Sequence, residues 1–247
     1  MMSKQSDIPV IEADYDGTRV NLATPPRDVG TYVAQGGLAL LKGAFPVDLL
    51  QNILDGVFAW GQQCAPQRES SVSFHRIDER PQQSRTPHTF HAYNFLLHPG
   101  AIDAKIDTLI RPIFSAMRDL QNAVAGTNAG FEPDAESRFL QPQVIQYPSG
   151  GGFFGEHVHP LEPQRVGLIV GLSEKGRDFK NGGTCFRVGG RNYSFEDTHS
   201  MGDIILFRYD VPHWITPIDD EEHLDWTRRA GRWTMVLPLL PGQKVTG

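Results

Sequence analysis

The sequence predicts a mainly β protein, a double-sheet jelly roll braced by N-terminal helices. The chain of 247 residues carries 25 glycines and 18 prolines, a turn content typical of many short strands rather than of a helical bundle. Helical periodicity is confined to the first 140 residues, and short apolar runs separated by turn signals follow. The eight predicted strands are 141–147, 156–159, 166–172, 183–188, 192–195, 204–209, 213–217 and 232–239.

Composition places the chain among ordinary globular proteins, with 39% hydrophobic and 21% charged residues. We predict a single domain over 1–247, in which 1–140 forms an N-terminal arm and helical brace and 141–241 forms the jelly-roll core. The predicted helices carry apolar stripes that need a sheet to cover, so neither part is expected to fold alone.

Charge and cysteine content exclude several classes of partner. The formal net charge of −6 argues against general binding to nucleic acid or to an anionic membrane surface. No apolar run approaches the ~18 residues that a membrane span requires, and the N-terminus has no signal-peptide pattern. Cys64 and Cys185 stand in no motif, so we expect neither a disulfide framework nor a thiolate zinc site, and a cytoplasmic location. The oligomeric state stays open.

The elements before residue 140 are predicted in order. A polar arm over 1–30 carries one strand near 18–22, and a buried strand follows at 37–43 between two glycines. A helix begins near Pro46, because apolar residues then recur at helical spacing through Phe58.

The next part of the chain is predicted to be a long loop and a helix. Residues 61–98 are polar and irregular, and we expect an ordered loop that helps to wall a pocket. Each of its four histidines is interpreted as a surface or hydrogen-bonded loop residue; they are His75, His88, His91 and His98. Residues 101–124 form an apolar helical stripe that Pro112 should kink or split, and 127–136 form a loop.

Two histidines follow the glycine-rich turn at 150–152. His157 and His159 are two residues apart, so in a strand both imidazoles project to the same face. This spacing suits two ligands of one metal ion, although two half-exposed histidines on an edge strand would show the same pattern.

Several pieces downstream occur in a recognisable order. They are Gly182-Gly183, Gly202-Asp203 before an apolar strand that ends at Phe207, His213 at the head of a short strand, and Gly231-Arg232-Trp233 at the last strand. Together with His157 they resemble the iron(II)/2-oxoglutarate-dependent oxygenases over residues 141–241. That resemblance implies a cupin-like double-stranded β-helix, and the helical region near 43–63 fits the brace of that family.

The resemblance also implies a set of site residues. His157 and His213 would bind Fe(II) from facing strands, with open positions left for 2-oxoglutarate and O2. Arg232 would receive the distal carboxylate of the cosubstrate with its planar fork. Thr234 is two residues on, so it faces the same way and can donate its hydroxyl, and Tyr147 corresponds to a phenol near the cosubstrate.

His159 stands where the family usually has aspartate or glutamate. It could complete a face of three histidines, it could leave that position to water, or the site could bind without catalysis. The halogenases of the family also lack the carboxylate. They carry a small residue there and bind halide in its place, and a histidine would obstruct the halide. Glu156 cannot easily substitute, because strand alternation points it away from His157.

Other candidates have plain structural interpretations. Asp203 follows a glycine at a strand entrance and is predicted to be a turn residue rather than a ligand. Arg228 and Arg229 compete with Arg232 for the cosubstrate carboxylate. The charged segment 218–230 is either a solvated loop or a lid beside the site.

These observations predict an Fe(II)/2-oxoglutarate-dependent dioxygenase that hydroxylates a small molecule and converts 2-oxoglutarate to succinate. Within enzymes, the alternatives are a three-histidine iron dioxygenase that does not use 2-oxoglutarate and a hydroxylase of protein side chains. The alternative outside enzymology is a catalytically inactive jelly-roll binding or sensor module.

Overall fold

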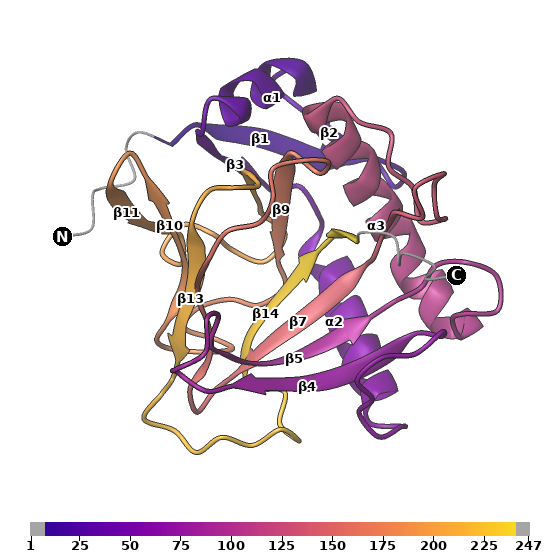
Figure 1. Cartoon of the computed structure of the whole chain (residues 1–247), viewed down its shortest axis with the longest axis vertical. Helices are drawn as coiled ribbons and strands as arrows, with labels where there is room; N and C mark the ends of the chain where they lie inside the picture. The colour runs from indigo at the N-terminus through magenta and orange to yellow at the C-terminus, as the bar shows by residue number, and fades with distance from the viewer. Residues whose placement is uncertain (1–7, 241–247) are drawn as a thin grey trace.

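The structure is a computed structural model that describes residues 8–240. Two facing sheets and three helices make up this part of the chain (Figure 1). The strands of the first sheet run in the order β7 (Gln143–Pro148), β14 (Gly231–Val236), β9 (Val166–Gly171) and β12 (Ile204–Arg208). The second sheet has the order β8 (Gly152–His157), β13 (His213–Ile218), β10 (Gly183–Val188) and β11 (Arg191–Ser194). All of these neighbours are antiparallel, which confirms the predicted double-sheet jelly roll.

The N-terminal strands extend this framework. The first sheet continues past β12 through β3 (Leu38–Lys42), β1 (Val10–Tyr15) and β2 (Val20–Leu22). At its other edge lie β5 (His88–Asn94) and β4 (Phe74–Arg80). The short strands β6 (Phe139–Leu140) and β15 (Leu239–Leu240) pair separately.

Strand β5 joins the two sheets at one edge. Its first residues pair with β8, where His88 lies opposite Phe154, and its later residues pair with β7, where His91 lies opposite Gln146. One strand thus hydrogen-bonds to both sheets and holds them together beside the site.

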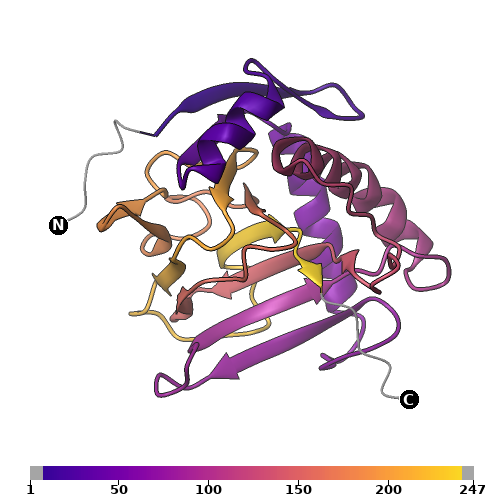
Figure 2. The same cartoon turned by 45° about the horizontal axis from the view of Figure 1, so that its top comes forward.

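The helices cover the outer face of the first sheet. They are α1 (Pro26–Ala34), α2 (Val47–Gly61) and α3 (Ala104–Ala125), and Figure 2 shows α2 and α3 on the same side of that sheet. Trp233 and Met235 of β14 belong to the core between helices and sheet, whereas Arg232 and Thr234 face the second sheet. No helix within 8–240 combines the length and apolar character needed to cross a membrane.

The structure corrects four expectations about local structure. Residues 61–98 contain the hairpin β4–β5 rather than a continuous loop. The sequence does not indicate these strands, because polar side chains occupy buried positions and bond to one another: Nδ1 of His75 lies 2.7 Å from Nε2 of His91. The described part of the arm, 8–30, holds β2, which confirms the strand predicted near 18–22, and in addition β1 and the start of α1. Of the two effects predicted for Pro112, a kink or a split, the split does not occur, because α3 runs through this residue. Strand β8 ends at His157 rather than at residue 159.

Asp203 anchors the turn before β12, as its interpretation as a turn residue predicts. Its buried carboxylate accepts hydrogen bonds from the ammonium of Lys42 and from the backbone N–H groups of Gly43 and Ser200. These contacts tie β3, its following turn and β12 together at one end of the sheet.

We expect Asp203→Ala to lower the free energy of unfolding by roughly 2–3 kcal/mol, because it leaves buried hydrogen-bond donors without an acceptor. The exposed Asp220 offers a matched control, and Asp220→Ala should change stability by less than about 0.5 kcal/mol. Urea unfolding of the two variants measures the difference. Equal stabilities would contradict a structural role for the Asp203 carboxylate.

Candidate metal and cosubstrate site

Two of the candidate ligands are brought together by strand register. His157 ends β8 and His213 begins β13, and the two residues are direct partners across this antiparallel pair. Residues opposite each other in such a pair project to the same side, so both imidazoles enter the space between the sheets. Their ring centroids lie 4.2 Å apart.

The same backbone contact orients both rings. Nδ1 of His157 lies 2.9 Å from the carbonyl oxygen of Gly155, and Nδ1 of His213 lies 2.9 Å from that of Val211. A carbonyl oxygen only accepts, so each Nδ1 carries the hydrogen and donates it. The lone pair of each ring is therefore on Nε2, the arrangement that orients a metal-binding histidine.

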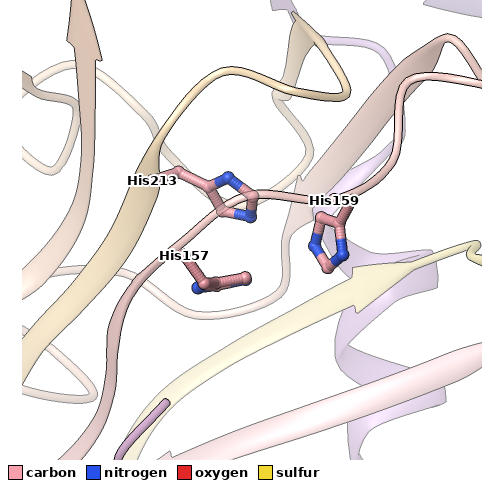
Figure 3. A group of neighbouring side chains, drawn as sticks. All are labelled: His157, His159 and His213. Atoms are coloured by element: carbon pink, nitrogen blue, oxygen red, sulfur yellow. The ribbon is translucent and has the colours of Figure 1, made fainter. Parts of the chain in front are cut away.

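His159 joins the other two from the segment after β8. Its ring lies 4.9 Å from that of His157 and 5.2 Å from that of His213, measured between centroids. One ring nitrogen from each of the three histidines lies within 4.8 Å of the others, and Figure 3 shows the side chains gathered around one point. Within residues 8–240 no hydrogen bond to the His159 ring is found, and stacking on Tyr209 at 4.4 Å and 14° orients it instead.

Burial keeps the three histidines uncharged at neutral pH. It lowers the pKa of His157 below its usual value and brings that of His159 down to about 4. It also holds the pKa of His213 well below its usual value, and the neighbouring His157 adds to the effect. All three imidazoles therefore present lone pairs, and the set could hold a divalent metal ion such as Fe(II).

The cosubstrate candidates face the same cavity. Tyr147 of β7 is the direct partner of Arg232 of β14, and Thr234 lies two residues on, so all three project to one side. Their side chains line the cavity that also contains the three histidines, and all three are buried. The structure thus brings together in one cavity the three histidines and the cosubstrate candidates Tyr147, Arg232 and Thr234.

Arg232 is held inside the barrel by a carboxylate. Its Nε donates to Oε1 of Glu196 at 2.6 Å, and the two side chains are only 2% and 5% exposed. Nη1 of the same guanidinium is buried and has no hydrogen-bond partner within residues 8–240. An unpaired buried donor of a cation that lines a cavity fits an anionic ligand such as the distal carboxylate of 2-oxoglutarate.

The competing arginines lie elsewhere. Arg229 pairs with Asp55 on the surface, and the side chain of Arg228 is exposed. Neither lines the cavity, so among the three arginines Arg232 is the one placed to meet a ligand there.

The two segments considered as walls or lids lie outside the cavity lining. Within the described chain, no residue of 61–98 or of 218–230 lines it. The second segment is tied down by Asp219, whose carboxylate accepts hydrogen bonds from the hydroxyl of Ser149 and the N–H groups of Lys180 and Asn181. The expectation of a pocket wall from 61–98 is therefore wrong for this cavity.

Three residues near the site were missed by sequence reasoning. Tyr209 stacks on His159, Phe154 stacks on His157 at 4.0 Å, and Glu196 pairs with Arg232. Tyr209 and Glu196 act through contacts between segments distant in sequence, Phe154 lies three residues before His157 on the same strand, and no spacing motif marks any of them.

Removing either strand-borne histidine should abolish tight metal binding. We expect His157→Ala and His213→Ala to weaken the affinity for Co(II), a redox-stable probe, by more than about 100-fold, and His159→Ala to weaken it by roughly 10–100-fold. Isothermal titration calorimetry measures the affinities. The exposed His223 supplies the control variant His223→Ala, which should bind as wild type does. Wild-type affinity in His159→Ala would remove His159 from the ligand set.

Comparison with known proteins finds no matching family model and no curated protein that matches in sequence. Solved structures do match in fold. A prolyl-4-hydroxylase from Pseudomonas putida is 15% identical with a TM-score of 0.54, over 89% of this chain and 100% of that one. A prolyl hydroxylase from Trichoplax adhaerens, solved with a hypoxia inducible factor peptide, is 11% identical with a TM-score of 0.56, over 87% and 90%.

A further match is a dioxygenase for auxin oxidation from Arabidopsis thaliana, solved with 2-oxoglutarate. It is 11% identical with a TM-score of 0.53, over 96% of this chain and 94% of that one. At these identities the likeness concerns the fold. The chain thus has the double-stranded β-helix fold of the iron(II)/2-oxoglutarate-dependent oxygenases, as the order of its sequence motifs predicts.

Proposed function

We propose that this chain is an Fe(II)/2-oxoglutarate-dependent oxygenase that hydroxylates a small molecule and converts 2-oxoglutarate to succinate and CO2. One observation carries the proposal: the cavity lined by three uncharged histidines is also lined by a buried arginine, Arg232, whose Nη1 has no partner. A metal-binding set and a free cationic donor in one cavity match a ligand that chelates at one end and carries a carboxylate at the other.

Each residue has a distinct task in this proposal. His157, His159 and His213 hold Fe(II), and the Nδ1–H bonds of the first and last keep Nε2 aimed at it. When bound, iron and 2-oxoglutarate supply the oxidation of a C–H bond by O2. Arg232 and Thr234 bind the distal carboxylate of the cosubstrate, and Tyr147 packs beside them.

The cavity wall favours an uncharged substrate group. Because the three histidines are uncharged, Arg232 is the one charged lining residue within 8–240, and it already pairs with the carboxylate of Glu196. Most of the remaining wall is aliphatic or aromatic, including Phe154, Phe207 and Ile215. Such a wall excludes water from the reacting C–H bond. Action in the cytoplasm is part of the proposal, and the free thiols of both cysteines support it.

A second candidate is a three-histidine iron dioxygenase that does not use 2-oxoglutarate. The ion pair between Arg232 and Glu196 favours it, because Arg232 then has a partner without any cosubstrate. The two candidates differ in whether the iron-loaded protein binds 2-oxoglutarate and forms succinate.

The proposal predicts that the anaerobic Fe(II) protein binds 2-oxoglutarate with a charge-transfer absorption band and forms succinate on exposure to O2. Arg232→Lys keeps the charge but loses the planar fork, so it should weaken 2-oxoglutarate binding by about tenfold. The matched control is Arg229→Lys, on the surface, with wild-type affinity expected. A wild-type protein that binds iron yet neither binds 2-oxoglutarate nor forms succinate would reject the proposal in favour of the second candidate.

A further inference from the structure

Glu196 is an almost fully buried acid that the proposed chemistry does not use. It follows β11, and its Oε1 accepts two hydrogen bonds, from Nε of Arg232 at 2.6 Å and from the backbone N–H of Thr184 at 2.7 Å. Burial alone would raise the pKa of Glu196, but Arg232, His199 and the N–H of Thr184 together outweigh that effect and hold the pKa below its usual value. The carboxylate is therefore charged and fixed from two sides.

The backbone of β10 is shaped to receive this side chain. Gly183 has φ of +140°, and a Cβ atom built on it would lie 1.6 Å from Cγ of Glu196. Only glycine leaves room for the acid there. Because β10 belongs to the second sheet and Arg232 to the first, the ion pair links the two sheets across the interior of the barrel.

The contact is specific to one edge of the guanidinium. Glu196 accepts from Nε, and Nη1 meets no acceptor in the described part of the chain. A guanidinium is planar, so an acceptor fixed on Nε also fixes the direction in which the outer nitrogens point.

Resting on the proposed function, we propose that Glu196 is a positioning residue for 2-oxoglutarate: it holds the Arg232 guanidinium by Nε so that the outer nitrogens are ready for the distal carboxylate. The fork is then preorganised before the ligand arrives, which lowers the cost of binding. Glu196 is not among the residues that line the cavity, so its effect passes through Arg232.

Two conservative variants separate positioning from simple neutralisation. Glu196→Gln removes the charge but keeps an oxygen that can accept both hydrogen bonds. Glu196→Asp keeps the charge but is one methylene shorter, so the contact with Nε is lost. Positioning predicts that the aspartate variant is impaired and the glutamine variant is not, whereas neutralisation alone predicts the reverse.

The experiment measures dissociation constants of the anaerobic Fe(II) protein for 2-oxoglutarate and for oxalate, a chelator that lacks a distal carboxylate. We expect Glu196→Asp to weaken 2-oxoglutarate about tenfold and to leave oxalate within about twofold, while Glu196→Gln stays within about threefold for both. In an Arg232→Lys background, the effect of Glu196→Asp should fall below about threefold, because lysine has no Nε edge to orient.

Three outcomes would overturn the inference. They are equal weakening of both ligands by Glu196→Asp, a larger loss in Glu196→Gln than in Glu196→Asp, or an undiminished effect in the lysine background. The exposed Asp197 supplies the control Asp197→Asn, which should bind both ligands as wild type does. A wild type that binds oxalate but not 2-oxoglutarate would reject the proposed function itself, a result distinct from a change confined to the Glu196 variants.

Discussion

The register between β8 and β13 is the constraint on which the site depends. It sets His157 directly opposite His213. The ring of each histidine is then oriented by the backbone carbonyl oxygen two residues earlier in the sequence. The same local contact at two neighbouring strands gives each ring an Nδ1–H donor bond and an Nε2 lone pair in the cavity. A one-residue slip would turn one imidazole to the opposite face of the sheet, so the metal-binding set exists only in this register.

A second constraint is the placement of a cation between two sheets. Desolvation makes an unpaired buried guanidinium costly, and Glu196 offsets that cost from the opposite sheet. The pairing leaves Nη1 unsatisfied, although buried donors are usually satisfied in folded proteins. A structure that stabilises a cation and yet leaves one of its donors free has the character of a binding site rather than of a structural ion pair.

Sequence patterns predict the jelly-roll core well because its strands are short apolar runs separated by glycine turns, and the strand of 166–172 is an example. They fail at the hairpin β4–β5, where the buried face carries polar side chains such as His75 and His91 that satisfy one another. They also miss Glu196, since its importance arises from a contact across 36 positions of sequence with Arg232. Motif order thus identifies residues that meet a ligand, whereas residues that act through a neighbour need the three-dimensional structure.

The three neutral histidines bring no negative charge to the cavity. Three neutral imidazoles leave the full charge of a divalent ion uncompensated, and Glu156 points away to pair with Arg187 at 2.6 Å. The buried carboxylate of Glu196 is engaged with Arg232. In the proposed enzyme, the negative charge that balances the metal therefore has to come from the chelating end of the cosubstrate. Metal and cosubstrate then strengthen each other's binding, and by linkage the two effects are equal. In that enzyme, a ligand set with no negative charge of its own would favour iron bound together with an anionic chelator over iron alone.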